Sequence, residues 1–221
     1  MADLFISYAR KDQEFVRRLH DALAERGKQA WVDWDDIPPT AQWVEEIKDG
    51  VSGADAFVFV LSPDSLNSTV CGNELAFALE QNKRIVSLLL REPDGAPVPG
   101  EVASANWIFF KDPAQFESAL DTLVRALDTD LERVRLHTRL LVRAGEWDER
   151  DRAASRLLRG DDLRDAEQFL SQPDVQPEPT ALQREYVAAS RRAAGRRQRA
   201  LLAGVSVALT IWLRSPPCLR T

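Results

Sequence analysis

The sequence of 221 residues contains only two cysteines, two histidines and ten glycines, and each scarcity excludes a class of protein. Cys71 and Cys218 lie in unrelated segments, which gives neither a disulfide framework nor a metal cluster and indicates a reducing compartment. His20 and His137 are isolated, which argues against a metal centre or a catalytic triad. Residues 7–11, after the first predicted strand, contain no glycine, which argues against a Rossmann or P-loop nucleotide site.

The N-terminus lacks the basic and long apolar regions of a signal peptide, so secretion by that route is not expected. Charge is distributed unevenly: residues 1–127 carry a net formal charge of −9, residues 128–172 carry −2 and residues 173–221 carry +5. The acidic first segment argues against nucleic acid as its main ligand, because phosphate contacts require a basic surface. Asp33, Asp35 and Asp36 resemble the acidic cluster of a phosphorylated receiver domain. The phosphorylation site of such a domain also needs an acidic pair on the first strand, and this pair is absent here because Asp3 precedes that strand.

Two apolar runs, residues 56–61 and 84–90, lack the alternation of a strand that has one face in water. Continuous apolar sequence is typical of parallel strands that helices cover on both faces. Further strands are predicted over residues 3–8, 29–33 and 106–110, and helices over residues 12–26, 40–50, 72–82 and 112–128. The sequence therefore predicts an α/β domain over residues 1–128, with a flavodoxin-like, doubly wound sheet of five parallel strands, followed by an α-helical extension.

Local signals within this domain give predictions that the structure can check. Asp12 is expected to cap the first helix and Gly27 to end it. Residues 62–70 and 92–105 are predicted to be loops. In the second helix, four apolar residues at helical spacing are expected to face inward: Trp43, Val44, Ile47 and Val51. Because ligands bind at the carboxyl ends of parallel strands, Glu74, just past the loop at residues 62–70, lies where a site is expected.

The remainder of the chain divides into three parts by composition: a charged helical extension over residues 129–172, a proline-rich linker over 173–181, and a basic helix with an apolar run over 182–221. Five arginines between Arg191 and Arg199 precede the apolar run at 200–213. This is the pattern of a membrane segment with its cytoplasmic side N-terminal. The run is shorter than the ~20 residues of a full span, so a tilted or truncated span, an interfacial anchor and a core helix all remain open.

Four motifs in this order resemble the box motifs of TIR (Toll/interleukin-1 receptor-like) domains: Phe5–Tyr8, Trp31–Asp33, Leu61–Leu66 and Cys71–Leu75. Ile37-Pro-Pro39 resembles the bacterial branch of that family. The tail resembles the stretch that joins a TIR domain to a membrane helix and WD-type repeats in larger bacterial proteins. The resemblance thus implies a cytoplasmic TIR domain, which the C-terminal segment would anchor to the inner face of the plasma membrane.

In members that cleave NAD+, the glutamate that matches Glu74 is catalytic, and the resemblance implies the same role here, with NAD+ as substrate and no further cofactor. A fixed carboxylate suits this chemistry because cleavage of the nicotinamide–ribose bond creates an oxocarbenium-like centre, and nicotinamide leaves without a general acid. The alternative for Glu74 is a solvated carboxylate near a helix N-terminus.

The resemblance also implies contacts to NAD+ from the loop at Tyr8, Ala9 and Arg10, with Arg10 suited to bind a phosphate. Other residues expected around the site are Trp31, Asp33, Ser65 and Cys71. Three of these residues have a purely structural alternative: Arg10 as an exposed arginine, Trp31 as a core residue, and Cys71 as packing without thiolate chemistry.

The sequence analysis therefore favours an NAD+ glycohydrolase or cyclase that self-association activates, in bacterial immune or stress signalling. In that family the loop after the second strand contacts a neighbouring copy and completes the pocket. The competing hypothesis is a non-enzymatic module in which the same surfaces mediate contacts between TIR domains and Glu74 is incidental.

Overall fold

The computed structural model describes residues 2–34, 41–104, 106–129, 131–172 and 177–214. Five parallel strands form one sheet in the order β2-β1-β3-β4-β5, which confirms the predicted doubly wound α/β fold. The strands are β1 (Leu4–Ser7), β2 (Ala30–Val32), β3 (Ala56–Leu61), β4 (Arg84–Leu89) and β5 (Ile108–Phe109). All six residues of β3 are buried, as expected for a central strand with both faces covered.

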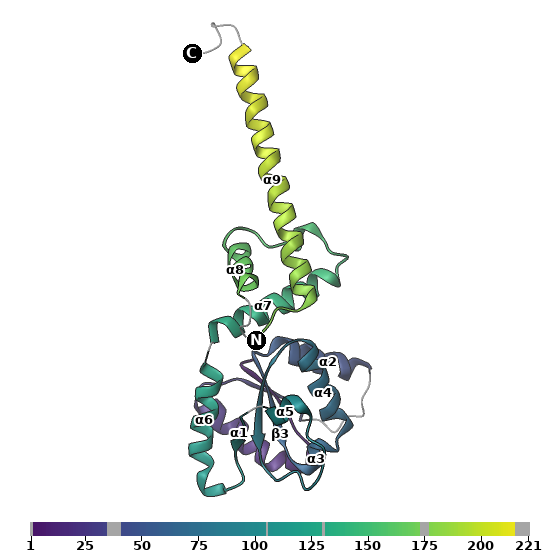
Figure 1. Ribbon diagram of the computed structural model, residues 1–221, viewed down its shortest axis with the longest axis vertical. Coiled ribbons are helices and arrows are strands. Elements are labelled where there is room, and N and C mark those ends of the chain that lie inside the picture. The colour runs from purple at the N-terminus through teal and green to yellow at the C-terminus, as the bar shows by residue number, and fades with distance from the viewer. Residues whose placement is uncertain (1, 35–40, 105, 130, 173–176, 215–221) are drawn as a thin grey trace.

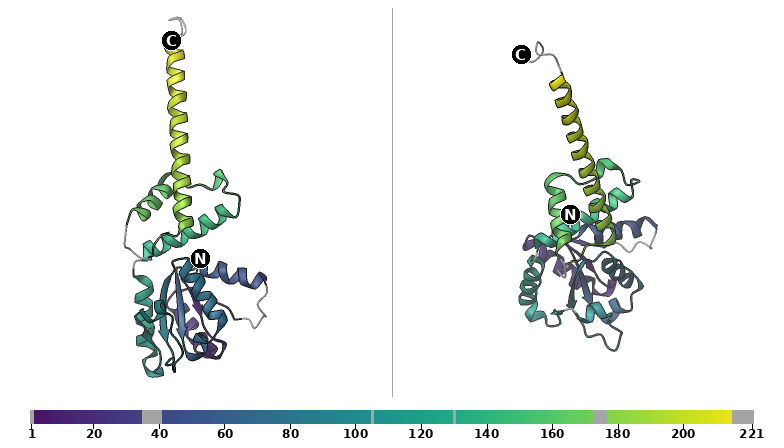
Figure 2. Two further views of the ribbon diagram at one scale, coloured as in Figure 1. Left: turned by 45° about the vertical axis from the view of Figure 1, so that its right-hand side comes forward. Right: turned by 45° about the horizontal axis from the view of Figure 1, so that its top comes forward.

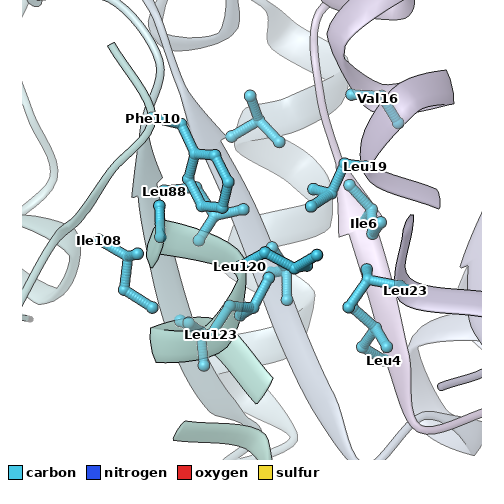
Figure 3. Packing of buried hydrophobic residues seen from close by; sticks show 14 of the residues in the cluster. Leu4, Ile6, Val16, Leu19, Leu23, Leu88, Ile108, Phe110, Leu120 and Leu123 are labelled. Carbon is cyan, nitrogen blue, oxygen red and sulfur yellow. The ribbon is translucent and has the colours of Figure 1, made fainter. Parts of the chain in front are cut away.

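Helices cover both faces of this sheet (Figure 1). α1 (Gln13–Glu25) and α6 (Phe116–Asp128) lie on one face, where Leu4, Ile6, Leu19 and Leu120 belong to one buried cluster (Figure 3). α2 (Ala41–Gly53), α4 (Thr69–Glu80) and α5 (Gly100–Ser104) lie on the other face. Because side chains alternate along a strand, Leu4 and Ile6 face α1 and α6, whereas Phe5 and Ser7 face the opposite layer.

Several local predictions were wrong. The predicted loops contain two short helices, α3 (Pro63–Leu66) and α5, and a 3-10 turn, η1 (Arg10–Asp12), precedes α1. α3 forms because Ser62 and Ser65 make a reciprocal capping box and Pro63 suits the first helical turn. Val44 is 37% exposed rather than inward.

Two further local predictions have different outcomes. Gly27 adopts a φ of +72°, which confirms it as the residue that ends the first helix. The loop after the second predicted strand and the first residue of the helix predicted over residues 40–50 lie largely outside the described residues.

The extension comprises α7 (Leu131–Asp148), a 3-10 turn η3 (Ala154–Arg156), α8 (Gly160–Ser171) and α9 (Ala181–Arg214). Tyr186 and Val187 of α9 share a buried cluster with Trp147 of α7 and Phe169 of α8. Composition predicts a separate segment over residues 182–221, but the first half of α9 belongs to the same helical layer as α7 and α8. Sequence composition could not show this, because it does not reveal which apolar residues meet.

The second half of α9 extends away from this layer (Figure 2). Among the described helices, none combines the length and the apolar character needed to cross a membrane. Membrane association through residues 200–213 stays a prediction.

The extension packs on the amino-terminal end of the sheet, where a buried lysine joins the two parts. Lys83, just before β4, donates hydrogen bonds to the carbonyl oxygens of Ser52 and Ala54, both at 2.7 Å, and to Thr138 Oγ1 of α7 at 3.4 Å. Burial lowers the pKa of Lys83 to about 7, although the nearby Asp55 carboxylate opposes this. The carboxyl end of the sheet, marked by α3 in Figure 1, lies at the other end of the domain.

Gly50→Ala is expected to destabilise the fold by about 1–3 kcal/mol through overpacking. A Cβ atom at Gly50 would lie 3.0 Å from two atoms of the Trp31 ring and 3.3 Å from Phe5, and these two rings are already stacked. Gly53→Ala is the matched control in the same helix, because a Cβ there meets no atom within 4 Å.

The control should stabilise the fold by up to about 1 kcal/mol through helix propensity. Urea unfolding of the two variants measures the difference. Equal stabilities would show that Trp31 yields and that this packing is loose.

Candidate active site

Glu74 lies in the second turn of α4 with its side chain turned toward the sheet. Ser68 caps this helix by accepting a hydrogen bond from the Cys71 amide at 3.3 Å. Cys71, Glu74 and Ala78 follow at helical spacing and are all buried, and Glu74 is only 7% exposed. The interpretation of Glu74 as a solvated surface carboxylate is therefore wrong.

Ser7 holds the Glu74 carboxylate from the sheet. Its hydroxyl donates a hydrogen bond of 2.6 Å to Glu74 Oε2, and Ser7 is 1% exposed. Ser7 lies within the motif Phe5–Tyr8 but is not among the site residues that the sequence predicts. Its position as a polar residue at the carboxyl end of an apolar strand was the signal that could have found it.

Burial raises the pKa of Glu74 from 4.5 to about 7. The Ser7 hydrogen bond opposes this rise, the Asp33 carboxylate adds to it, and the Arg10 guanidinium opposes it. Because the pKa lies near neutral pH, both the protonated and the ionised forms of Glu74 are populated under ordinary conditions. Perturbed carboxyl groups of this kind are concentrated at functional sites.

Tyr8, Arg10 and Asp33 form a second polar group beside Glu74. The Tyr8 hydroxyl donates to the Asp33 carbonyl oxygen at 2.9 Å, and Arg10 Nη1 donates to the same oxygen at 2.7 Å. Arg10 Nη2 also donates to Asp33 Oδ2 at 2.7 Å. The structure therefore brings together three of the predicted residues, with the Arg10 guanidinium engaged by Asp33 and 39% exposed.

The other predicted residues occupy structural positions. The Trp31 ring is stacked on Phe5, at a centroid distance of 4.7 Å, which matches its alternative as a packing residue. Ser65 forms the capping box of α3 with Ser62. Burial raises the pKa of the Cys71 thiol to about 11, which suits packing rather than thiolate chemistry. Ala9 is buried, and its carbonyl accepts from the Asp12 amide at 2.7 Å.

A cavity of about 760 Å³ lies elsewhere, between α7, α8 and the amino-terminal end of the sheet. Its lining mixes acidic residues such as Asp55 with arginines such as Arg135, so the charges do not select one type of ligand. The size of this cavity therefore points to one end of the sheet, whereas the chemistry of Glu74 points to the other. We favour the region around Glu74 as the functional site because it holds a buried carboxylate at the carboxyl edge of a parallel sheet. Within the described residues, no group of three histidine, cysteine or acidic residues is placed to hold a metal ion.

The family model of the TIR domain matches residues 4–124, more than half of the sequence, so the chain belongs to the TIR domain family. No curated protein matches the chain. Among solved structures, it is similar to the TIR domain of the Toll-related receptor TRR-2 from Hydra magnipapillata, with 24% identity and a TM-score of 0.49, over 57% of this chain and 98% of that one.

Two further structures are similar over the same domain. A metazoan TIR-STING receptor from C. gigas, solved in complex with 2',3'-cGAMP, is 21% identical with a TM-score of 0.45, over 55% of this chain and 39% of that one. The TIR domains of the activated Roq1 resistosome, which recognises the pathogen effector XopQ, are 21% identical with a TM-score of 0.36, over 64% of this chain and 81% of that one. The family assignment rests on the family model alone.

Glu74→Gln is expected to stabilise the fold above pH 7 and to have little effect at acidic pH. A carboxyl group whose pKa rises on folding contributes stability that is complete below its unfolded pKa of 4.5 and is lost as the pH rises through about 7. Glutamine resembles the protonated form and does not ionise, so the gain reaches about 3 kcal/mol at alkaline pH.

Urea unfolding of the full chain at about pH 5 and about pH 8 measures this gain. Glu80→Gln, an exposed glutamate of the same helix, is the control and should change stability little at either pH. A Glu74→Gln variant that loses stability at the higher pH would show that the folded protein prefers the charged carboxylate.

Proposed function

We propose that this TIR domain cleaves the bond between nicotinamide and ribose in NAD+, with Glu74 as the catalytic carboxylate. The observation that carries the proposal is the buried Glu74 side chain, held by Ser7 at the carboxyl end of the sheet. A glutamate incidental to function has no reason to be buried with a pKa raised to about 7, because such burial lowers stability whenever the group is ionised.

The chemistry requires a fixed negative charge close to the ribose. When the glycosidic C–N bond breaks, its electron pair leaves with nicotinamide and C1 of the ribose becomes oxocarbenium-like. The ionised Glu74 carboxylate stabilises that positive charge, and it does so more strongly in a buried site than in water. Water then adds to C1 and releases a proton, which gives ADP-ribose, whereas attack by a nucleophile of the ADP-ribosyl group itself gives a cyclic product.

The neighbouring polar residues are suited to hold the nucleotide. Arg10 presents a guanidinium group that is 39% exposed and is kept in place by Asp33 and Tyr8. We assign the phosphates of NAD+ to Arg10 and the ribose side to Asp33. Ala9, Trp31, Ser65 and Cys71 contribute to the packing and capping of the elements that carry these groups.

We also propose that self-association activates the enzyme, because in the TIR family the loop after the second strand contacts a neighbouring copy and completes the pocket. We place the reaction in bacterial immune or stress signalling, and in a larger protein of the TIR and WD-repeat type. An arginine-rich α9 would keep such a domain at an anionic membrane surface.

The clustered 221-residue chain is expected to release nicotinamide from NAD+, and Glu74→Gln should lower that rate by at least about 100-fold, as loss of a fixed transition-state charge does. Clustering is achieved with a hexahistidine-tagged chain on nickel-chelating vesicles, and nicotinamide is measured by chromatography. The full chain is required because α9 contributes Tyr186 and Val187 to the core of the extension.

Glu80→Gln is the matched control and should retain the wild-type rate. Folded, clustered wild type that releases no nicotinamide would favour the non-enzymatic interaction module. Release that survives Glu74→Gln would show that another residue is catalytic.

The rate of nicotinamide release is expected to rise with pH through an apparent pKa near 7, because only the ionised form of Glu74 stabilises the positive centre. Ser7→Ala should move this limb to higher pH, because the Ser7 hydrogen bond favours the ionised form. Ser118→Ala, at an exposed serine of α6, should leave the profile unchanged. A Ser7→Ala pH profile identical to that of wild type would show that the rise in rate does not report the ionisation of Glu74.

A further inference from the structure

Asp12 is a buried carboxylate at the carboxyl end of the sheet. The sequence predicts it as the cap of α1, but its side chain makes no capping hydrogen bond. Instead, Ser62 Oγ donates to Asp12 Oδ2 at 2.6 Å, and Arg91 Nη2 donates to Asp12 Oδ1. The Asp12 side chain is only 2% exposed. A charge this buried is tolerated only with close partners, so Asp12 depends on both contacts.

These contacts join three loops that are far apart in the sequence. Asp12 ends the turn after β1, Ser62 follows β3 and caps α3, and Arg91 follows β4. Arg91 Nη2 also donates to Asp64 Oδ2 of α3 at 2.8 Å. Lys11 Nζ donates to Asp64 Oδ1 at 2.6 Å, so the same α3 residue contacts both Arg91 and the turn after β1.

Both sides of the proposed active site lie next to this network. On one side, the Asp12 amide closes the turn onto the Ala9 carbonyl at 2.7 Å, which fixes the segment that carries Tyr8 and Arg10. On the other side, α3 leads into α4, whose start is set by the Ser68 amide bonding to the Ser65 carbonyl at 3.2 Å. α4 carries Glu74, so one ionic network borders both the nucleotide-binding loop and the catalytic helix.

We propose that Asp12, through Arg91 and Ser62, is a positioning residue that holds the Tyr8–Arg10 segment in the geometry that binds NAD+. Its effect on NAD+ binding rests on the proposed function, whereas its effect on the loop does not. Asp12 touches none of the groups assigned to substrate. Loss of its charge therefore displaces the binding loop and leaves the Ser7–Glu74 contact in place.

The test compares four variants of the full chain: Asp12→Asn, Arg91→Met, the double variant that carries both changes and, as control, Asp121→Asn. Asp121 pairs with Arg26 between α1 and α6 of the same domain, so its loss removes an ion pair away from the site. Amide hydrogen exchange of residues 8–12 reports the loop independently of activity. Arg91 is 46% exposed, so Arg91→Met tests the same network even if Asp12→Asn fails to fold.

Asp12→Asn and Arg91→Met are expected to speed exchange of residues 8–12 at least about tenfold. Arg91→Met leaves the buried Asp12 charge without its cationic partner, and Asp12→Asn removes the charge that holds Arg91 and Ser62 to the turn after β1. The control should leave these residues unchanged. The effect of the double variant should be smaller than the sum of the two single effects, because the two residues act as one pair. Exchange at residues 8–12 that equals the control, or that rises equally throughout the domain, would overturn the proposal.

Kinetics separate positioning from catalysis. The KM for NAD+ should rise about tenfold or more in Asp12→Asn and Arg91→Met, with a smaller change in kcat. The acid limb of the pH profile, which is the rise in rate through the apparent pKa near 7, should stay as in wild type. A loss confined to kcat, or a shifted acid limb, would contradict the positioning role. If wild type releases no nicotinamide, the proposed function fails, and the exchange experiment still decides whether Asp12 holds the loop.

Discussion

The structure of the site depends on one hydrogen bond, from the Ser7 hydroxyl to a Glu74 carboxylate that the sheet and α4 bury almost completely. Burial favours the neutral carboxyl group, whereas the hydrogen bond from Ser7 favours the ionised form. The balance places the pKa of Glu74 near 7, where a small change in its surroundings alters its charge. The properties of Glu74 therefore follow from its position in the fold and not from the glutamate alone.

The sheet topology brings these groups together from distant parts of the sequence. β1 lies between β2 and β3, and Ile6 is in register with Val32, so Ser7 and Asp33 come next to each other at the same edge. α4 follows β3 and returns over the same face, which carries Glu74 to Ser7. The extension packs at the other end of the strands through Lys83 and Thr138. The helices of the extension therefore pack against the domain at the end of the sheet opposite the site and do not cover it.

The sequence was sufficient for much of the fold because its strongest signals are local. The apolar runs at 56–61 and 84–90 predicted buried parallel strands, and the structure confirms both. The matches at Phe5–Tyr8 and Cys71–Leu75 predicted the TIR family, which the family model confirms. They also directed attention to Glu74, although its catalytic role stays a proposal.

Long-range contacts were beyond the sequence. Asp12 has the ideal local context for a helix cap, but Arg91, 79 positions later, takes its carboxylate instead. Ser7 ends an apolar strand, which could have marked it as a candidate, but its contact with Glu74 becomes apparent only when α4 is placed over β1. Tyr186 lies in a basic, helix-prone segment, and its burial depends on contact with Trp147 of α7. In each case the deciding partner comes from another element, and local propensity carries no information about it.

The catalytic role of Glu74 is tested most directly by its ionisation in the folded 221-residue chain. Carbon-13 NMR of glutamate side chains, with Glu74→Gln to assign the signal, measures its pKa. We expect a pKa of about 7 for Glu74, and this pKa should rise further in Ser7→Ala. A value near 4.5, the ordinary value for glutamate, would show that the carboxylate is solvated and would remove the physical basis for its catalytic role.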